Sequence, residues 1–287
     1  MGFQAVEDPD AFRASSRGRW EEAAGGWAAA REAFQRAAAP VSRWLVEAIG
    51  PQPGQTVLEL AAGPGDTGLL AAERLRPGGK LISTDGATAM VEVARARAEE
   101  LGRAEIVEAR PMEVEWIDME AATVDAVLCR WGYMLVPDPE TALRETRRVL
   151  KPGGRVAFAV WDAVARNPWS MGRRIVDLGF EEPSPPHTPG PFALGDRDLV
   201  RELLYGAGWT DDILIEPLDF AFTAADAEAW WAQQLDCSLA LKGLVAKLSP
   251  AEHYRLRDAV DADLEQYVQP DGTLRIPART LVVSATA

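Results

Sequence analysis

The sequence predicts an α/β protein built on a doubly wound, mostly parallel, seven-stranded sheet. Short apolar runs of strand type alternate with amphipathic helical segments from residue 56 to residue 161, which is the pattern of successive βαβ units. Most of these runs are nearly continuous in apolar residues, as expected of strands that helices cover on both faces. A glycine-rich turn between the first strand and the following helix belongs to the same pattern.

Each element has its own local signal. Seven segments are predicted to be strands: 56–60, 80–84, 105–107, 125–129, 155–161, 212–222 and 275–284. Amphipathic helices are predicted over 87–101 and 139–150. Asp138 suits the N-cap of the second helix, because its carboxylate accepts hydrogen bonds from the free N–H groups of the first turn, and Pro139 suits the first helical position. The two glycines at 153–154 are expected to end this helix.

Helical segments flank the core on both sides. Residues 8–49 have a helical pattern in which Pro40 predicts a break between two helices. Residues 223–271 are predicted to be an insertion between the last two strands, with helices that begin at capping boxes, one at Thr223 and one at Ser249. The predicted divisions are an N-terminal helical lid (1–49), a cofactor-binding core (50–222), a helical cap insertion (223–271) and the last strand of the core (272–287).

Composition limits the classes of function. Of the 287 residues, 47% are hydrophobic and 26% are charged, as in ordinary globular proteins. The formal net charge of −14 repels phosphate backbones, so we expect no nucleic-acid partner. The two cysteines, Cys129 and Cys237, lack metal-type spacing and predict neither a disulfide framework nor a metal site. Because no segment has the apolar length of a signal peptide or a membrane span, we expect a cytoplasmic protein without membrane insertion.

A glycine-rich loop is the strongest chemical signal in the sequence. Gly63, Gly65 and Gly68 follow a strand and begin a helix, where glycine lets the backbone turn tightly and lets a ligand approach without a Cβ in the way. Asp85 lies 20 residues after Gly65, at the expected end of the second strand, from which a carboxylate bonds ribose hydroxyls. This pattern alone fits a nicotinamide dinucleotide as well, or a turn that binds nothing.

Four segments resemble the class I S-adenosylmethionine-dependent methyltransferases, especially the subgroup of the ubiquinone/menaquinone-biosynthesis C-methyltransferases. The segments have the order and the spacing that the family shows. They are VLELAAGPGDTG (57–68), STDGATAMVEVARARA (83–98), DAVLCRWGYMLVPDPETALRETRRVLKPGG (125–154) and RVAFAVWD (155–162). The turn RVLKPGG at 148–154 is the most specific, because nicotinamide enzymes do not have it before their fifth strand. The resemblance covers about residues 42–162 and implies a Rossmann-like fold that binds S-adenosylmethionine.

The resemblance also implies which residues hold the cofactor. They are Glu59, Ala61, Gly63, Gly65, Asp85, Gly86, Met90, Met112, Glu113 and Arg130. The loop residues are expected along the methionine part of the cofactor, and Asp85 is expected to hold its ribose hydroxyls. Gly86 and Met90 are expected near the adenosine, and Arg130 near the methionyl end.

Two positions depart from the family pattern. The first glycine of the acidic-x-Gly-x-Gly-x-Gly motif is Ala61, which is a small change. Met112 and Glu113 fall in the loop after the third strand that usually meets the adenine ring, but Pro111 replaces the aspartate that commonly accepts the adenine amino group. Backbone groups are therefore expected to take a larger part in recognising adenine.

Aromatic residues follow the strands at the edge where open α/β sheets bind ligands. Trp131 and Tyr133 follow the fourth strand and Trp161 follows the fifth. These rings can line an acceptor pocket, approach the sulfonium of the cofactor, or simply pack between the sheet and its cap. Trp230 is assigned to the same pocket, because adjacent helical residues point to different faces and only one of Trp230 and Trp231 is expected to reach it.

Methyl transfer depends on alignment more than on any one catalytic side chain. A general base is needed only where the acceptor does not readily lose its proton. His187, in the proline-rich segment 181–191, is the candidate base, with a solvated loop histidine as the alternative.

The sequence therefore predicts an enzyme that transfers a methyl group from S-adenosylmethionine to carbon, oxygen or nitrogen of a small, largely apolar acceptor. A nicotinamide-dependent oxidoreductase and a cofactor-binding protein without catalysis remain as alternatives. We expect a monomer or a homodimer. The insertion at 223–271 can roof the acceptor pocket, with Trp20 and Trp27 closing the other side, or it can form a dimer interface, and we favour the roof.

Overall fold

A single sheet organises the chain in the computed structural model, which describes residue 3 and residues 6–185 and 188–287. The strands are β1 (Thr56–Leu60), β2 (Lys80–Asp85), β3 (Val107–Pro111), β4 (Val124–Arg130), β5 (Leu150–Trp161), β6 (Asp211–Ala224) and β7 (Leu274–Thr286). The α-helices are α1 (Pro9–Ile49), α2 (Asp66–Leu75), α3 (Thr88–Glu100), α4 (Pro139–Val149), α5 (Gly172–Asp177), α6 (Arg197–Gly206), α7 (Ala227–Cys237), α8 (Leu239–Val245) and α9 (Pro250–Leu264). Short 3-10 turns occur at η1 (Tyr133–Leu135), η2 (Val164–Arg166) and η3 (Glu265–Tyr267).

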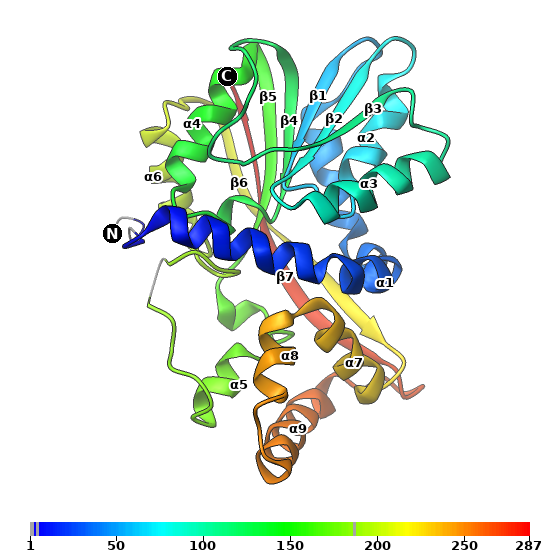
Figure 1. Ribbon diagram of the computed structural model, residues 1–287, viewed down its shortest axis with the longest axis vertical. Coiled ribbons are helices and arrows are strands. Elements are labelled where there is room, and N and C mark those ends of the chain that lie inside the picture. Colours follow the sequence, from blue (N-terminus) through cyan, green and yellow to red (C-terminus); the bar gives the residue numbers. More distant parts are fainter. Residues whose placement is uncertain (1–2, 4–5, 186–187) are drawn as a thin grey trace.

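The strand order is β3-β2-β1-β4-β5-β7-β6, and β7 is antiparallel to both of its neighbours (Figure 1). The order reverses between β1 and β4, which are parallel. Because parallel crossovers are right-handed, this reversal puts α2 and α3 on one face of the sheet and α4 on the other. The predicted doubly wound, mostly parallel sheet of seven strands is confirmed.

Helix α1 differs from its prediction. It is one continuous helix of 41 residues, and Pro40 lies inside it rather than in a break. The N-cap Asp8 accepts a hydrogen bond from the N–H of Ala11, and Gly50 ends the helix at φ +55°. The residues after Pro40 continue the helix because Val41 and Leu45 are buried in the main core, where packing outweighs the one hydrogen bond that proline lacks. Figure 1 shows the first part of α1 crossing the molecule at the lower end of the sheet and its last part turning toward the sheet.

The insertion between β6 and β7 contains three α-helices rather than the predicted two, all within the described chain. Asp226 is the N-cap of α7, so the capping box expected at Thr223, which lies in β6, is wrong. The capping box of Ser249 with Glu252 at the start of α9 is confirmed. Helix α5, which was not predicted, packs on α9, and these helices form a lower lobe around the far ends of β6 and β7 (Figure 1).

Strand β3 is displaced from its prediction by two residues at its start, and it continues to Pro111. Its side chains are only partly buried, so an apolar run does not mark it. Among the described helices, none has both the length and the apolar character needed to cross a bilayer. Asp138 caps α4 as predicted, accepting from the N–H of Thr141.

Candidate functional site

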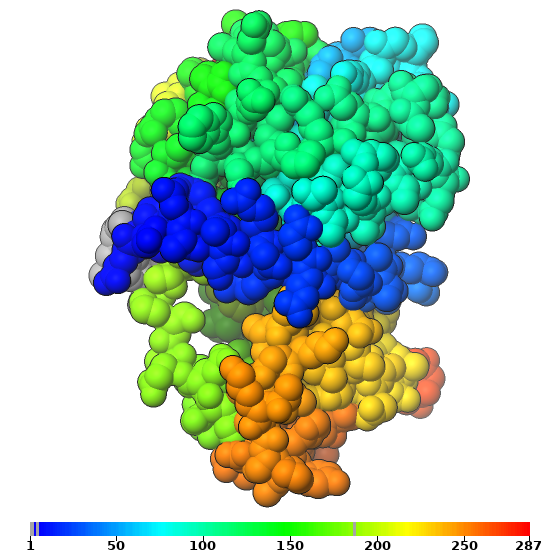
Figure 2. Space-filling model, in the orientation of Figure 1, coloured from blue at the N-terminus to red at the C-terminus, as the bar shows by residue number. Residues whose placement is uncertain are grey.

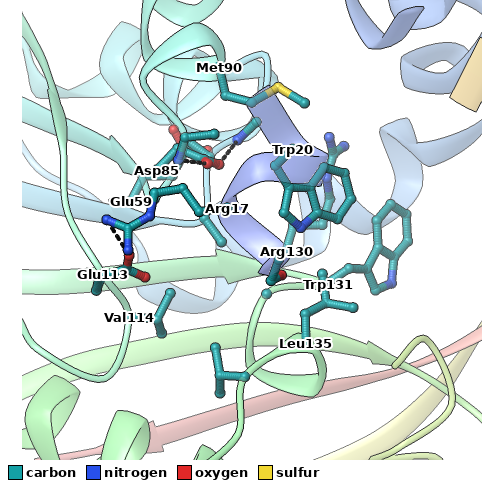
Figure 3. A pocket seen from close by; sticks show the side chains of 18 of the residues that line it. Arg17, Trp20, Glu59, Asp85, Met90, Glu113, Val114, Arg130, Trp131 and Leu135 are labelled. Atoms are coloured by element: carbon teal, nitrogen blue, oxygen red, sulfur yellow. Dashed lines mark hydrogen bonds and ion pairs between the residues drawn. The ribbon is translucent and has the colours of Figure 1, made fainter. Parts of the chain in front are cut away.

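A cavity lies at the carboxyl ends of β1, β2 and β4, beneath the first half of α1 (Figure 3). Its floor consists of the loops that follow these strands, and Phe12, Ser16, Arg17 and Trp20 of α1 form its roof. The cavity is at the reversal of strand order, where loops leaving β1 and β4 run in opposite directions. Open α/β sheets bind ligands in this crevice. In Figure 2, α1 forms a continuous band across this face of the molecule.

The loop after β1 is left-handed at three positions, with φ at +49° for Ala61, +52° for Gly63 and +80° for Gly65. A Cβ on Gly65 would lie 3.0 Å from the Cβ of Ala94 on α3, so glycine allows this close packing. Apart from its two chain neighbours, no atom of the described residues lies within 4 Å of the Cβ position of Gly63, which lines the cavity. The loop therefore leaves open space beside its backbone for a ligand.

Ala61 adopts this left-handed conformation although it has a Cβ, which costs about 1 kcal/mol. Its methyl group has room because residue 132, in the loop after β4, is glycine. A Cβ on Gly132 would lie 2.5 Å from the Cβ of Ala61 and 2.7 Å from the Sγ of Cys129. Alanine at position 61, where the family pattern has glycine, is thus accommodated by the glycine at position 132 across the cavity floor.

Glu59 is buried below the loop and ties it to two other elements. Its Oε1 accepts a hydrogen bond from the N–H of Gly68 (2.6 Å), at the start of α2, and its Oε2 accepts one from the hydroxyl of Ser83 on β2 (2.8 Å). Burial raises the pKa of Glu59 to about 7, although these hydrogen bonds oppose the rise. A Cβ on Gly68 would lie 2.2 Å from Oε2, so a larger residue there would displace the carboxylate of Glu59.

Asp85, at the end of β2, connects both sides of the cavity floor. Its Oδ2 accepts from the N–H of Gly63 (2.8 Å), and its Oδ1 accepts from the N–H of Ala87 (3.0 Å). Burial raises the pKa of this carboxyl. Figure 3 shows the side chain among the residues that line the cavity, above Arg17 in this view. Asp85 thus lines the cavity and orders the glycine loop, and its expected bond to ribose hydroxyls stays a prediction.

Arg130, at the end of β4, is a half-buried cation that lines the cavity. Its Nη1 donates to the side-chain oxygens of Gln35 (2.6 Å) and Ser42 (2.8 Å), both on α1. Burial lowers the pKa of its guanidinium, and the carboxylate of Asp66 partly opposes this effect. The guanidinium carbon lies 5.1 Å from the centre of the Trp131 ring. Within the described residues no carboxylate forms an ion pair with Arg130, so the cavity contains a positive charge with donors to spare.

Gly86, Met90 and Glu113 also line the cavity. The Oε2 of Glu113 would lie 3.2 Å from a Cβ on Gly86, and its Oε1 lies 3.5 Å from Nη1 of Arg17 in the roof. Met112 is different, because its side chain packs in the main hydrophobic core and does not line the cavity. Its expected place next to the adenine ring is therefore corrected to a place in the core.

Of the four aromatic residues predicted for an acceptor pocket, Trp131 alone lines this cavity among the described residues. Tyr133 is completely buried, and its hydroxyl bonds Oγ1 of Thr146 (2.6 Å). Trp161 stacks on Trp131 with 4.4 Å between ring centres, and Trp230 is buried in the core. The prediction put these rings near the correct edge of the sheet, but side-chain direction places Tyr133, Trp161 and Trp230 in the core.

His187 lies outside the described residues, so its predicted role stays a prediction. The roof residues Phe12, Arg13, Ser16 and Arg17 were not predicted. The signal that reveals them is helical spacing, because they form one face of α1 with Trp20.

Known proteins share the segment that forms the cavity floor. Residues 58–158 match the family model of a methyltransferase domain. A ubiquinone/menaquinone biosynthesis C-methyltransferase, UbiE, of Acidiphilium cryptum is 40% identical over 115 residues, which are 39% of this chain and 45% of the relative. An uncharacterised protein of Mycobacterium tuberculosis is 32% identical over 173 residues, which are 60% of each. The matched segments thus span about half the length of these curated relatives.

A solved structure supports the fold over most of the chain. A geranyl diphosphate methyltransferase in complex with S-adenosylmethionine has a TM-score of 0.53 and 19% identity, with 91% of this chain and 90% of that chain covered. The segment matched by the family model runs from β1 into β5, so it contains the glycine loop, Asp85 and Arg130. Residues 58–158 thus match a methyltransferase domain in sequence, and the chain shares the fold of a solved methyltransferase.

Proposed function

We propose that this chain binds S-adenosylmethionine in the cavity beneath α1 and transfers its methyl group to a small, largely apolar molecule. The observation that carries the proposal is the half-buried carboxylate of Asp85, which lies in the cavity wall and orders the glycine loop through the N–H of Gly63. A nicotinamide-dependent oxidoreductase is not favoured, because the family match is to a methyltransferase domain.

The chemistry of the cavity residues fits this cofactor. Each oxygen of Asp85 accepts one backbone hydrogen bond and has a further lone pair for a ribose hydroxyl. Arg130 uses one terminal nitrogen for Gln35 and Ser42, so its remaining donors suit the carboxylate of the methionyl group. The apolar side chains of Met90 and Val114 suit the faces of the adenine ring.

The acceptor side of the cavity is apolar. Phe12 and Trp20 face Leu135 and Val136 across it, and none of its described lining residues is a histidine, lysine or cysteine. The bound sulfonium would supply the electrophilic methyl group. The chain would contribute alignment and exclusion of water, so the acceptor must present its own nucleophilic carbon, oxygen or nitrogen. His187 stays a candidate base for an acceptor that keeps its proton.

A largely apolar acceptor has support from the relatives too. The relative from Acidiphilium cryptum is named for ubiquinone and menaquinone biosynthesis, and quinones of this kind are flat rings with apolar substituents. The apolar walls formed by α1 and the loop after β4 agree with such a molecule.

We propose that α1, rather than the insertion at 223–271, is the roof of the site. No residue of the insertion lines the cavity in the described part of the chain. The insertion instead supports α1 from behind: a Cβ on Gly26 would lie 2.2 Å from the carbonyl oxygen of Asp236 at the end of α7. A monomer and a homodimer both agree with this arrangement.

The test is differential stabilisation by ligands. S-adenosylhomocysteine at about 100 times its Kd is expected to stabilise the fold by about 2.7 kcal/mol, which a thermal unfolding measurement detects, whereas NADH is expected to give no shift. Asp85→Ala is expected to weaken binding about tenfold or more, because two ribose hydroxyls lose a charged acceptor. A shift with NADH alone would favour the oxidoreductase. Binding of the thioether without methyl transfer to any quinone-like acceptor would favour a non-catalytic binding protein.

A further inference from the structure

Helix α3 begins without a capping side chain of its own. Its N-cap residue is Ala87, which has no side-chain acceptor, and the first helical residues are Thr88 and Ala89. The N–H groups of a first turn have no partner within the helix and need an acceptor from elsewhere. Alanine is among the poorest N-cap residues for this reason.

Glu21, from the first half of the roof helix α1, supplies the missing acceptors. Its Oε1 accepts from the N–H of Thr88 (2.6 Å) and its Oε2 from the N–H of Ala89 (2.8 Å). Both carboxylate oxygens are thus used on one helix terminus, where a negative charge is also favoured by the helix dipole. Within the described residues Glu21 forms no ion pair, so this contact accounts for its position.

The turn that Glu21 holds is part of the cavity floor. Asp85, Gly86 and Ala87 all line the cavity, and the N–H of Ala87 is bound by Asp85. The three successive N–H groups of residues 87 to 89 therefore donate to two carboxylates. One carboxylate, Asp85, belongs to the floor, and the other, Glu21, belongs to the roof. The roof and the ribose-binding position are joined at this point.

Other polar contacts between α1 and the floor lie on both sides of Glu21. Toward the end of α1, Arg31 bonds Asp66 at the start of α2 (2.7 Å), and Gln35 and Ser42 accept from Arg130.

The contacts nearer the start of α1 involve the loop after β3. Arg13 makes two 2.9 Å hydrogen bonds with Glu115, and Arg17 lies 3.5 Å from Glu113. These contacts hold the roof to the loop after β3. Glu21 holds it to α3, directly beside Trp20, which covers the cavity.

We propose that Glu21 is a positioning residue that locks α1 onto the first turn of α3, so that the cofactor leaves the cavity only after this cap has been released. The inference rests on the proposed function, because it takes the cavity as the cofactor site. Lifting α1 leaves a carboxylate and two N–H groups without their partners. Release of the cofactor must therefore include the loss of an N-cap.

The test uses S-adenosylhomocysteine as the probe and the full chain. We expect Glu21→Ala to release it about fivefold faster, within a range of roughly two- to thirtyfold, which corresponds to the loss of an N-cap. Dissociation can be followed by tryptophan fluorescence, because Trp20 and Trp131 line the cavity. Glu22→Gln is the matched control, because Glu22 is the exposed neighbour on the same helix, and it is expected to release the probe at the wild-type rate.

A second variant separates the lock from simple stabilisation of α3. In the Glu21→Ala background, Ala87→Ser gives α3 a local cap. Hydrogen exchange of the amides at the start of α3 is expected to slow again, whereas probe release is expected to stay fast, because α1 remains unattached. Glu21→Gln is expected to release the probe at an intermediate rate, since its one oxygen can serve one of the two N–H groups.

The possible results are distinguishable. Three results would overturn the lock while leaving the cofactor site intact. Glu21→Ala could release the probe at the wild-type rate, Glu22→Gln could speed release as much as Glu21→Ala does, or Ala87→Ser could restore slow release in the Glu21→Ala background. Failure of the wild type to bind S-adenosylhomocysteine would instead overturn the proposed function, and the lock with it. Fast release that Ala87→Ser does not reverse supports the lock.

Discussion

The two sides of the strand-order reversal are held together by different forces. Around the cavity, carboxylates bind backbone N–H groups of distant segments. Glu59 is buried, whereas Asp85 and Glu21 are half-buried. Toward β6 and β7, aromatic rings stack in a cluster, with centroid distances between 4.4 and 6.1 Å from Trp131 through Trp161 to Phe220. The first side leaves polar backbone in reach of a ligand, and the second excludes water and fixes the β6–β7 pair. Ligand binding and stability are therefore expected to respond to different substitutions.

The largest expected effect tests this separation on the aromatic side. Trp161→Ala is expected to lower the free energy of unfolding by about 3 to 5 kcal/mol, because it leaves a cavity inside a stacked cluster. Denaturant unfolding measures this loss, and calorimetry is expected to find the Kd for S-adenosylhomocysteine nearly unchanged. Trp161→Phe, which retains a ring, is the control and is expected to lose less. A tenfold weaker Kd in Trp161→Ala would show that the two sides act as one unit through Trp131.

The next effect sharpens the comparison on the polar side through pH. Burial raises the pKa of Glu59 from 4.5 to about 7 in the folded protein. The protonated carboxyl is thus the form that the fold favours, so its contribution to stability is complete below pH 4.5 and is lost as the pH rises to 7. This carboxyl is expected to lower the free energy of unfolding by at most about 3 kcal/mol across that window.

Glu59→Gln is expected to lack this part of the pH dependence. The amide oxygen can still accept from the N–H of Gly68, and the amide nitrogen can donate to the hydroxyl of Ser83. Urea unfolding on both sides of the window measures the difference, with Glu22→Gln as a control that follows the wild type. Identical pH dependence in Glu59→Gln and the wild type would mean that Glu59 is not a buried, pH-sensitive brace.

The smallest expected effect lies where the two sides meet. Ala61→Gly is expected to raise the free energy of unfolding by at most about 1 kcal/mol, because it removes the strain of a left-handed alanine. Gly132→Ala is expected to lower it, since its Cβ would lie 2.5 Å from the Cβ of Ala61. The loss is expected to be smaller in the Ala61→Gly background, and a double-mutant cycle by denaturant unfolding measures this coupling. Additive effects would contradict direct contact between the two positions.

Local signals predicted the polar side of the fold well. The glycine loop and the position of Asp85 depend on backbone conformation and on strand ends, which apolar runs and glycines mark directly in the sequence. The predicted position of β3 was two residues too early, because its partly buried side chains form no apolar run that would mark the strand. Pro40 suggested a break, but the burial of the residues around it in the core keeps α1 continuous.

Contacts between segments that are far apart in the chain could not be predicted from the sequence. Glu21 and Thr88 are 67 positions apart, and nothing near either residue reveals their pairing. Tyr133 and Trp161 follow the strands as predicted, but packing decides where their rings point: Tyr133 turns inward to Thr146, and Trp161 joins the stack. The insertion has one more helix than predicted because Ser238 is both the C-cap of α7 and the N-cap of α8. A connection of one residue is too short to show a turn pattern in the sequence.

The place of β7 in the sheet has a consequence for how the protein is made. This strand comes last in the described chain, yet it lies between β5 and β6, and β6 has no other neighbour in the described sheet. During synthesis, one edge of β5 and both edges of β6 therefore stay unpaired until residues 274–286 have emerged from the ribosome. Unpaired edges of this kind attract other chains, and pairings across long sequence distances form slowly. We expect the nascent protein to depend on chaperones until this strand has inserted and closed the sheet.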